Sequence, residues 1–283
     1  MQDDITIRPA TLSDVPDIRT IHEGDDDPWA DIATCAIWTN HRLLRGFLIE
    51  VAILDGEAVG HAEWIVSPEP EPIGVHLYLG VLQVRSDVRG LGIGRALVIS
   101  GKSHAKQVGC SSMRTNPAVE TADFYLKNGF LFERAVESIA IPVQGDKIDV
   151  GWRKLRSVSR RTCRTLPMRV GWYQGSSAHM WEVVNSWPPV YGDDINSASA
   201  AIRDQAVVQT YSFAGSERGS TVAWASRDIA TTDLVRPILA LGGRLGKSPV
   251  SICVPLPDSE EIQRHFDAVR EEKFEIWRAP IHG

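Results

Sequence analysis

Several kinds of residue and segment are scarce in this sequence of 283 residues. Its four cysteines are widely spaced and form no Cys-x-x-Cys pair, and none of its eight histidines belongs to a His-Glu-x-x-His motif. We therefore expect no metal site, and cysteines that are buried or free thiols in a reducing cytoplasm. No apolar run approaches about 18 residues, and the acidic start MQDDITIRP is unlike an export signal. These absences predict a cytoplasmic protein that is neither exported nor membrane-spanning.

Positive charge is also in short supply, because 36 acidic residues outnumber 30 lysines and arginines and leave a formal net charge of −6. A general role in nucleic-acid binding is therefore not expected. The exception is the arginine-rich stretch RKLRSVSRRTCRTLPMR at residues 153–169. It is either a patch that binds phosphate or nucleic acid, or a solvated connector, and the acidic bulk favours the connector. We place a basic linker at residues 156–167.

Strand and helix signals alternate on both sides of this linker, which predicts an α/β protein with a mixed α+β sheet and two domains, 1–155 and 168–283. Residues 12–22 carry apolar side chains at three-residue spacing, which is typical of an amphipathic helix. In the second part we expect strands near 168–173 and 250–254, and helices near 177–186, 194–204, 232–242 and 258–271. The order of elements roughly repeats that of the first part, which indicates a degenerate internal duplication.

The stretch VRGLGIGRALV at residues 88–98 places three glycines at alternate positions just before a helical pattern. Glycine lets backbone N–H groups approach a ligand closely, and a helix N-terminus attracts anions, so phosphate is the expected ligand. The dinucleotide motif G-x-G-x-x-G fails, since Arg95 and Leu97 stand where its last glycine would be. The nucleoside-triphosphate loop fails as well, because no Lys-Ser or Lys-Thr pair follows. The motif that remains is R-x-x-G-x-G, at Arg89, Gly92 and Gly94.

Further along the chain, NPAVETADFYLKNGFLFE at residues 116–133 combines an asparagine, an A-x-F-Y sequence and a closing Gly-Phe pair. Together with the opening IRPATLSDVPDI at residues 7–18, these motifs resemble, in the same order, the GNAT superfamily of acyl-CoA-dependent N-acyltransferases. The resemblance covers residues 1–155, whereas residues 165–283 share only the order of elements and have no glycine turn. It implies a GNAT-like N-terminal domain followed by a smaller, degenerate GNAT-like domain. The implied reaction moves an acetyl group from acetyl-CoA to a primary amine within a ternary complex.

For acetyl-CoA, the resemblance implies contacts along the glycine motif and the strand before it. The backbone at Leu82 and Val84 would hold the pantetheine arm. Backbone amides would hold the pyrophosphate, and they belong to Arg89, Gly90, Leu91, Gly92, Ile93 and Gly94. The side chains of Arg89 and Arg95 would add positive charge, although both are also compatible with simple surface exposure. Asn116 would either bridge to the cofactor or only cap its helix.

The same resemblance makes Tyr125 the candidate general acid, because a phenol is protonated at neutral pH and can donate a proton to the departing thiolate. Its alternative role is that of a core aromatic residue. Many relatives carry a glutamate on the strand before the glycine turn, and this sequence has none between residues 73 and 84. The candidate bases are His76 on that strand and Glu63, which would act through a water from the preceding strand. Both are equally compatible with structural roles, and the need for a protein base stays open.

The acidic stretch HEGDDDPW at residues 22–29 follows the first predicted helix, where relatives shape the acceptor site. Its carboxylates would attract a cationic amine such as a lysine side chain or a polyamine, or would form an exposed loop that caps a helix. They belong to Glu23, Asp25, Asp26 and Asp27. We expect a small-molecule or peptide amine as partner, and neither nucleic acid nor a membrane. The alternative function is a non-catalytic acyl-CoA-binding or interaction module, and the sequence indicates no oligomeric state.

Overall fold

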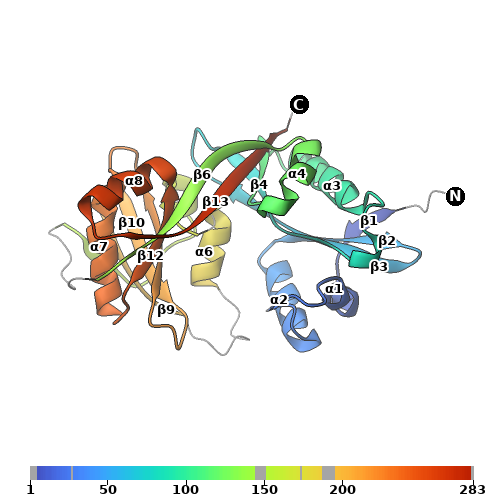
Figure 1. The fold of residues 1–283 in the computed structure, drawn as a ribbon, viewed down its shortest axis with the longest axis horizontal. Coiled ribbons are helices and arrows are strands. Elements are labelled where there is room, and N and C mark those ends of the chain that lie inside the picture. The colour runs from blue at the N-terminus through green and yellow to red at the C-terminus, as the bar shows by residue number, and fades with distance from the viewer. Residues whose placement is uncertain (1–4, 27, 144–150, 173, 187–194, 282–283) are drawn as a thin grey trace. The chain divides into compact units, whose positions relative to one another are not determined.

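The computed structural model describes residues 5–26, 28–143, 151–172, 174–186 and 195–281. They form a mixed α/β protein with parallel and antiparallel strand pairs, as predicted (Figure 1). The chain divides into two compact units. Unit 1 consists of Met1–Val66, Val75–Leu131 and Arg278–Gly283, and unit 2 of Ser67–Gly74 and Phe132–Trp277. No helix in the described part of the chain is both long and apolar enough to cross a bilayer.

The first strands of unit 1 lie side by side in chain order, with helices on both faces of the sheet (Figure 1). The strands are β1 (Thr6–Pro9), β2 (Leu48–Leu54), β3 (Glu57–Pro68), β4 (Val75–Val84) and β5 (Ser112–Thr115). The helices are α1 (Val15–Ile21), α2 (Ile32–Leu44), α3 (Ile93–Gln107) and α4 (Ala122–Lys127). Successive side chains of strand β3 point to opposite faces of the sheet, so β3 contacts helices on both faces. Gly60 lies against Ile93 of α3, whereas Glu63 accepts a hydrogen bond from Trp38 of α2.

Strands β4 and β5 run parallel and separate before β4 ends. Their ladder joins residues 76–79 to residues 112–115. β4 then continues through residues 80–84, which have no partner on the β5 side in the described ladder and are half-buried or exposed. Unit 1 therefore has an open split beside the C-terminal end of β4.

Unit 2 repeats the order of elements of unit 1. It runs through β8 (Met168–Val170), α6 (Ser177–Asn185), β9 (Asn196–Ile202), β10 (Ala206–Ser212), β11 (Gly219–Ala225), α7 (Thr231–Arg244), β12 (Val250–Pro255), α8 (Leu256–His265) and β13 (Val269–Pro280). Strands β9, β10, β11 and β12 take the places of β2, β3, β4 and β5 in this order, and α7 takes that of α3. The pairing agrees, since β10 is antiparallel to β9 and β11 whereas β11 is parallel to β12.

Two helices predicted in the second half need correction. The helix predicted at 194–204 is wrong, because residues 196–202 form strand β9. This strand pairs with β10 on one edge and with β7 (Arg153–Leu155) on the other, so ladder hydrogen bonds on both sides outweigh the helix propensity of its alanines. The helix predicted at 258–271 is too long, since α8 ends at His265 and β13 begins at Val269.

Strand β8 fills in unit 2 the place that stays open in unit 1. By chain order β8 corresponds to β1, yet β7 occupies the edge of β9. β8 pairs instead with the C-terminal part of β11 at Trp224, and Gly171 just after it donates a backbone hydrogen bond to Cys253 of β12 (2.9 Å). In the described ladder, β11 and β12 pair with each other only at their first two residues. The chain therefore fills its own split in unit 2.

The last strand of each half belongs partly to the other unit. β6 (Leu131–Ile141) passes from unit 1 into unit 2 and pairs antiparallel with β12. β13 passes from unit 2 into unit 1, where Ile281 donates a backbone hydrogen bond to Ser111 (3.1 Å). The main crossing between the compact units therefore falls at Leu131. The predicted domains 1–155 and 168–283 divide the sequence into its two repeated halves, and they remain a prediction.

The segment predicted as a basic linker, residues 156–167, is part of unit 2 and not a solvated connector. Its residues Val158, Cys163 and Leu166 are buried, and they pack with Met180 of α6 in one core cluster. The short helix α5 (Thr162–Thr165) lies within it.

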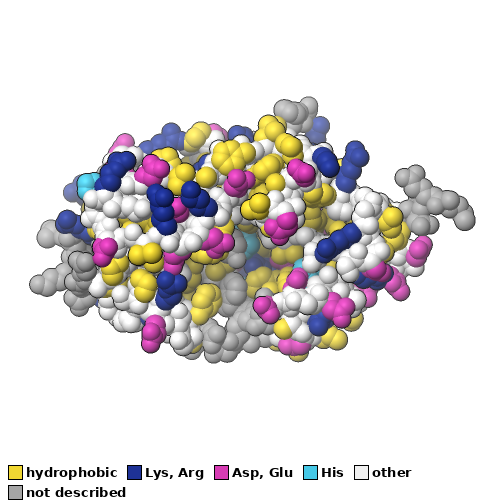
Figure 2. All heavy atoms as spheres, in the orientation of Figure 1, with side chains coloured by type: hydrophobic (Ala, Val, Ile, Leu, Met, Phe, Trp, Pro, Cys, Tyr) yellow, Lys and Arg dark blue, Asp and Glu magenta, His cyan; other side chains and the backbone are white. Residues whose placement is uncertain are grey.

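On the face of the molecule shown in Figure 2, basic and acidic side chains are interspersed, so charge of neither sign is concentrated there.

All four cysteines are free and buried, as predicted for buried or free thiols. Burial raises the pKa of Cys35, Cys110 and Cys163 to about 11 and that of Cys253 to about 12. The thiolate is the reactive form, so we expect the native protein to react very slowly with 5,5′-dithiobis(2-nitrobenzoate) at mildly alkaline pH. The same assay in guanidinium should count all four thiols. Fast reaction of any cysteine in the native protein would contradict this burial.

Candidate active site

A cleft of about 890 Å³ lies in unit 1 at the end of β4. Its walls come from residues 82–84 of β4, the glycine turn, the first turn of α3, and α4 with the segment before it. The predicted residues in its lining are Leu82, Val84, Arg89, Gly90, Gly92, Ile93, Gly94, Arg95 and Tyr125. The lining also contains residues to which the sequence analysis assigned no role, namely Gln83, Glu120, Thr121, Phe124, Lys127 and Asn128. The glycine motif and the Tyr125 motif, which are separate in the sequence, thus share one cleft.

The glycine turn leaves backbone N–H groups without acceptors at the wall of the cleft. Gly90 and Gly92 have φ of +86° and +89°, a left-handed conformation that residues other than glycine rarely adopt. Gly92 is the N-cap of α3, and the N–H of Ala96 donates to its carbonyl oxygen. The N–H groups ahead of Ala96 have no acceptor within the helix, and they lie at the positive end of its dipole. Such an arrangement binds an anion.

One hydrogen bond and one packing contact hold the glycine turn against its neighbours. Arg89 donates from Nε to the carbonyl oxygen of Val84 (3.0 Å), so its guanidinium ties the turn to the end of β4. Gly94, in the first turn of α3, faces Phe124 of α4, where an added Cβ would lie 3.3 Å from the ring. A larger residue at 94 would therefore push α3 and α4 apart at the cleft. Leu91 is 58% exposed and is not among the lining residues.

Tyr125 lies on α4 in the wall of the cleft and is 8% exposed. Its ring packs edge-on against Phe124 and Phe130, with centroid distances of 5.1 and 5.4 Å. Burial raises the pKa of Tyr125, and a hydrogen bond with the Thr115 side chain opposes that shift only in part. Thr115 is the last residue of β5 that pairs with β4. The phenol therefore lies beside the point where the two strands separate.

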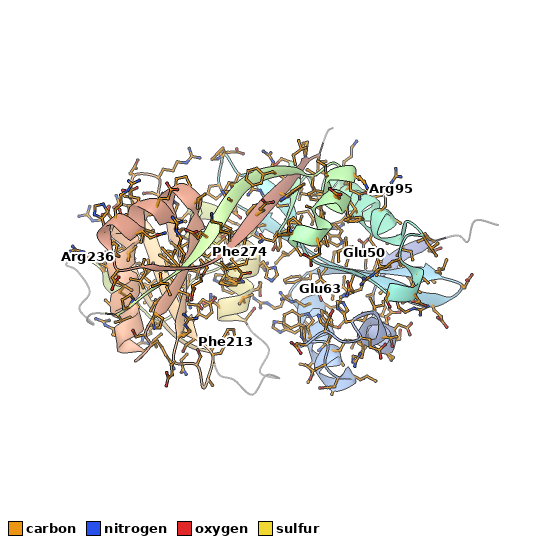
Figure 3. All side chains as sticks on the ribbon, viewed as in Figure 1. Glu50, Glu63, Arg95, Phe213, Arg236 and Phe274 are labelled. Carbon is orange, nitrogen blue, oxygen red and sulfur yellow. The ribbon has the colours of Figure 1, made fainter. Side chains whose placement is uncertain are left out.

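The two candidate bases lie outside the cleft. His76 is fully buried in the paired part of β4, opposite Ser112. Glu63 is 3% exposed and lies on the α2 side of the sheet, whereas Arg95 lies on the α3 side (Figure 3). Trp38 donates to Glu63 (3.0 Å), and burial raises the pKa of this carboxyl group. Neither His76 nor Glu63 lines the cleft, so this geometry gives no support to either as a base.

Asn116 follows β5 and does not line the cleft. The short helical turn after it has Ala118 as its N-cap, so Asn116 does not cap that turn. Its Oδ1 atom is buried and has no hydrogen-bond partner among the described residues. This oxygen is an available acceptor close to the end of β5.

Unit 1 also contains a chain of polar side chains that the sequence analysis missed. His22, just after α1, bonds through Nδ1 to Asp25 (2.8 Å) and through Nε2 to Nδ1 of His61 on β3 (2.9 Å). Both imidazoles are buried, and burial lowers the pKa of each. The Asp25 carboxylate is partly exposed, and Nε2 of Gln83, in the lining of the cleft, approaches it to 3.5 Å. The signal available in the sequence was the spacing His-x-x-Asp.

The acidic stretch is therefore anchored at one position. Glu23 and Asp26 are exposed, and Asp27 lies outside the described residues. Asp25 is tied both to the buried His22 and to the strand that carries the cleft. Of the carboxylates predicted to attract an amine, it is the one that the structure places beside the cleft.

Several solved protein structures match the fold of both halves of this chain. One of them is a GCN5-related N-acetyltransferase from Anabaena variabilis, with 12% identity and TM-score 0.67. The match covers 99% of this chain and 73% of that chain. Another, from Sphaerobacter thermophilus, has 14% identity and TM-score 0.54 and covers 99% and 96%. A tandem GNAT protein from the clavulanic acid biosynthesis pathway has 12% identity and TM-score 0.57 and covers 99% of both chains.

Similarity in sequence covers less of the chain than similarity in fold. No curated protein sequence matches the chain. Residues 12–130 match the family model described as the acetyltransferase (GNAT) family. This range includes the glycine turn, the end of β4 and Tyr125, which together line the cleft. Residues 12–130 therefore form a domain of the GNAT acetyltransferase family.

Proposed function

We propose that the protein is an N-acetyltransferase that moves an acetyl group from acetyl-CoA to a primary amine by direct transfer in a ternary complex. The observation that carries the proposal is the cleft of unit 1, in which an anion-binding turn, an unpaired strand end and a buried phenol adjoin one another. The family of residues 12–130 supports acyl transfer in general. The acetyl donor and the amine acceptor are the finer part of the proposal.

The lining of the cleft fits acetyl-CoA. The free N–H groups of the glycine turn suit the pyrophosphate, and Arg95 and Lys127 add positive charge at the wall. Residues 80–84 of β4 offer backbone hydrogen-bonding groups to the amides of the pantetheine arm, in the manner of an added strand. A cleft of about 890 Å³ is within the range that holds cofactors and substrates of this kind.

In the proposed reaction the amine is neutral when it attacks. An ammonium group first gives one proton to water, and the nitrogen lone pair then forms a bond to the thioester carbonyl carbon. The carbon–sulfur bond breaks, the thiolate leaves with the electron pair and takes the proton of Tyr125, and the phenol regains a proton from the amine nitrogen. The products are an amide, the thiol of CoA and one proton. Burial suits Tyr125 to this step, because its raised pKa keeps the phenol protonated at neutral and mildly alkaline pH.

The acceptor that we propose is cationic and contacts Asp25. When Nδ1–H of His61 donates to Nε2 of His22, the remaining hydrogen of His22 is on Nδ1 and donates to Oδ2 of Asp25. Gln83 approaches the same oxygen. The other carboxylate oxygen, Oδ1, has no hydrogen-bond partner among the described residues and is available to an ammonium group.

The variant Asp25→Asn keeps the size of the side chain and removes its charge. We expect the KM for a cationic amine to rise about fivefold, because an ion pair at a partly exposed site contributes about 1 kcal/mol. The Kd of acetyl-CoA should not change. Steady-state kinetics check this, with Asp26→Asn as the matched control from the same exposed stretch. Equal increases of KM in both variants would contradict a specific role for Asp25.

The second candidate function is an acyl-CoA-binding or interaction module without turnover. The observation that favours it is the position of His76 and Glu63, neither of which lines the cleft. Such a module would bind acetyl-CoA through the same turn and strand end. It would release no CoA thiol in the presence of amines.

Thermal unfolding with and without acetyl-CoA, followed by a thiol-release assay, separates these candidates. At a hundredfold excess over its Kd a ligand stabilises the native state by about 2.7 kcal/mol, which corresponds to a Tm increase of about 5–11 °C for a large domain. The assay would use spermidine, glucosamine, methylamine and a lysine-containing peptide as acceptors. A Tm increase together with thiol release supports the transferase, and a Tm increase without release from any acceptor supports the binding module. No increase at saturating acetyl-CoA would overturn both.

A further inference from the structure

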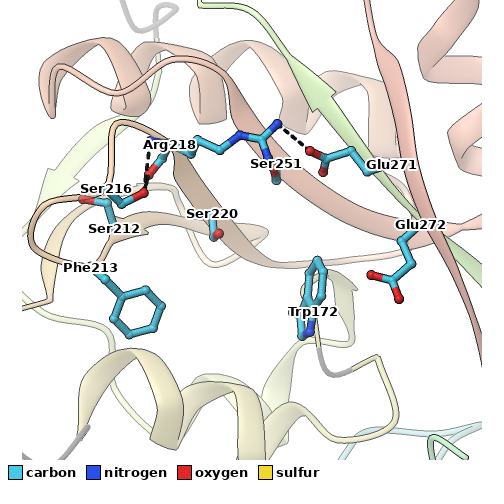
Figure 4. A pocket seen from close by; sticks show the side chains of 9 residues that line it. All are labelled: Trp172, Ser212, Phe213, Ser216, Arg218, Ser220, Ser251, Glu271 and Glu272. Atoms are coloured by element: carbon cyan, nitrogen blue, oxygen red, sulfur yellow. Dashed lines mark hydrogen bonds and ion pairs between the residues drawn. The ribbon is translucent and has the colours of Figure 1, made fainter. Parts of the chain in front are cut away.

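A second cavity, of about 390 Å³, lies in unit 2 at the start of β11 and β12 (Figure 4). Its lining comes from β10, β11, β12 and β13, from the hairpin between β10 and β11, and from Trp172, which follows β8. We propose that this cavity binds a small polyhydroxylated amine. This is a binding function of unit 2 that is separate from acetyl transfer in unit 1.

The floor of the cavity offers hydroxyl groups from neighbouring strands. Ser220 of β11 and Ser251 of β12 are partners in the parallel ladder, so their side chains lie next to each other on one face of the sheet. A hydroxyl group both donates and accepts hydrogen bonds, which suits the hydroxyl groups of a polyol. Ser212 also lines the cavity, but alternation along β10 turns its side chain to the opposite face of the sheet from Ser220.

Two aromatic rings flank this floor. Figure 4 shows Phe213 and Trp172 on either side of Ser220. Trp172 is 38% exposed, and it is held edge-on against Phe274 with the centroids 5.0 Å apart. The negative face of an exposed indole ring attracts the polarised C–H groups of a sugar-like ring. The walls therefore suit a compact molecule that has one apolar face and hydroxyl groups along its edge.

The charged side chains at the rim favour a cationic ligand over an anionic one. Arg218 is neutralised by Glu271, with Nη2 and Oε1 2.6 Å apart, and Ser138 donates to the other oxygen of Glu271 (2.9 Å). Glu272 lines the cavity and has no ion pair with any described residue. The lining therefore carries one surplus negative charge. It repels phosphate and is complementary to an ammonium group.

This cavity is not a remnant of an acyl-CoA cleft. The cleft of unit 1 lies at the C-terminal end of β4, next to the start of α3. The cavity of unit 2 lies at the N-terminal ends of β11 and β12, and strand β8 occupies the split at their other ends. The two cavities are thus built at opposite ends of corresponding strands.

Isothermal titration of the full chain with glucosamine and with glucose tests the proposal, because these probes differ in one ammonium group. We expect saturable binding of glucosamine and about fivefold weaker binding of glucose, as one partly solvated ion pair is lost. Glu272→Gln should weaken glucosamine to the level of glucose and leave glucose unchanged. Trp172→Ala should weaken both probes. The matched control is Glu260→Gln, an exposed carboxylate on α8 outside the cavity, which should bind both probes as the parent does.

Two outcomes would overturn the proposal. The first is the absence of saturable glucosamine binding at millimolar concentration by the parent chain. The second is binding that Asp25→Asn weakens and Glu272→Gln does not, because the amine would then occupy the acceptor side of unit 1. Glu272→Gln is conservative and exposed, so it keeps the test valid even if Trp172→Ala fails to fold.

Discussion

Titration of the whole chain with acetyl-CoA will show one binding site per chain, and Gly92→Glu will remove it. In unit 2, β8 lies in the split that would admit the pantetheine arm. The start of α7 is also occupied, because Arg169 donates to Thr231 (2.8 Å) and Thr231 donates to the Asp258 carboxylate (2.7 Å). The negative charge of Asp258 thus lies beside the first residue of α7, where it disfavours binding of a phosphate. In unit 1 the corresponding turn is free.

The effect of Gly92→Glu on affinity should be large, about a hundredfold or more, since it combines repulsion with the loss of charge-assisted hydrogen bonds worth about 1.5–3 kcal/mol each. The matched control is Gly109→Glu. Gly109 has φ of +74° with open space around it, so the backbone strain is similar, but it lies beyond the far end of α3. Gly109→Glu should lower the Tm and retain affinity. Two sites per chain, or binding that survives in Gly92→Glu, would show that unit 2 binds acetyl-CoA.

Replacing Tyr125 by Phe should lower turnover about a hundredfold, the smaller end of the range for loss of a general acid. The Kd of acetyl-CoA should change less than twofold, because the ring keeps its packing against Phe124 and Phe130 and loses only the hydroxyl group. The raised pKa of Tyr125 also sets the pH dependence. The acid form is lost only when pH rises above this raised pKa, so ionisation of Tyr125 should not lower the rate at neutral or mildly alkaline pH.

The matched control for this variant is Tyr211→Phe, which removes a buried phenol hydroxyl from the core of unit 2. It should leave turnover unchanged. Pre-steady-state thiol release measures the chemical step directly and avoids product release. An unchanged rate in Tyr125→Phe would assign protonation of the thiolate to another group. Equal loss in both variants would indicate a general effect on stability.

The cleft was predictable where local sequence alone determines the backbone. The glycine motif was expected to form a tight turn before a helix, and Gly90 and Gly92 have positive φ just before α3. Tyr125 lies in the same cleft as this turn. His22 and Asp25 were not predictable as a pair with His61, because that contact joins residues far apart in the chain. Glu63 was chosen for its strand, but alternation along β3 turns it towards α2 and away from the cleft.

The fold shows the same division between local and distant determinants. Hydrophobic periodicity located most helices, whereas β9 was misassigned because its alanines favour a helix and its two partner strands decide its conformation. The position of β8 was beyond prediction for a related reason. β7 occupies the edge of β9 and β8 pairs with β11, and both contacts join residues that are far apart in the chain.

The exchange of terminal strands has a consequence for the order in which the protein can be completed. Unit 1 contains the cleft beside the glycine turn and most of it precedes unit 2 in the chain, yet residues 278–281, which follow unit 2, belong to it. A ribosome therefore exposes the edge of β5 unpaired until residues 278–281 have been made, and unpaired edges favour aggregation. A stop codon just before residue 278 would damage unit 1, which had been translated earlier. For the same reason, neither half can be obtained intact by dividing the gene at one point.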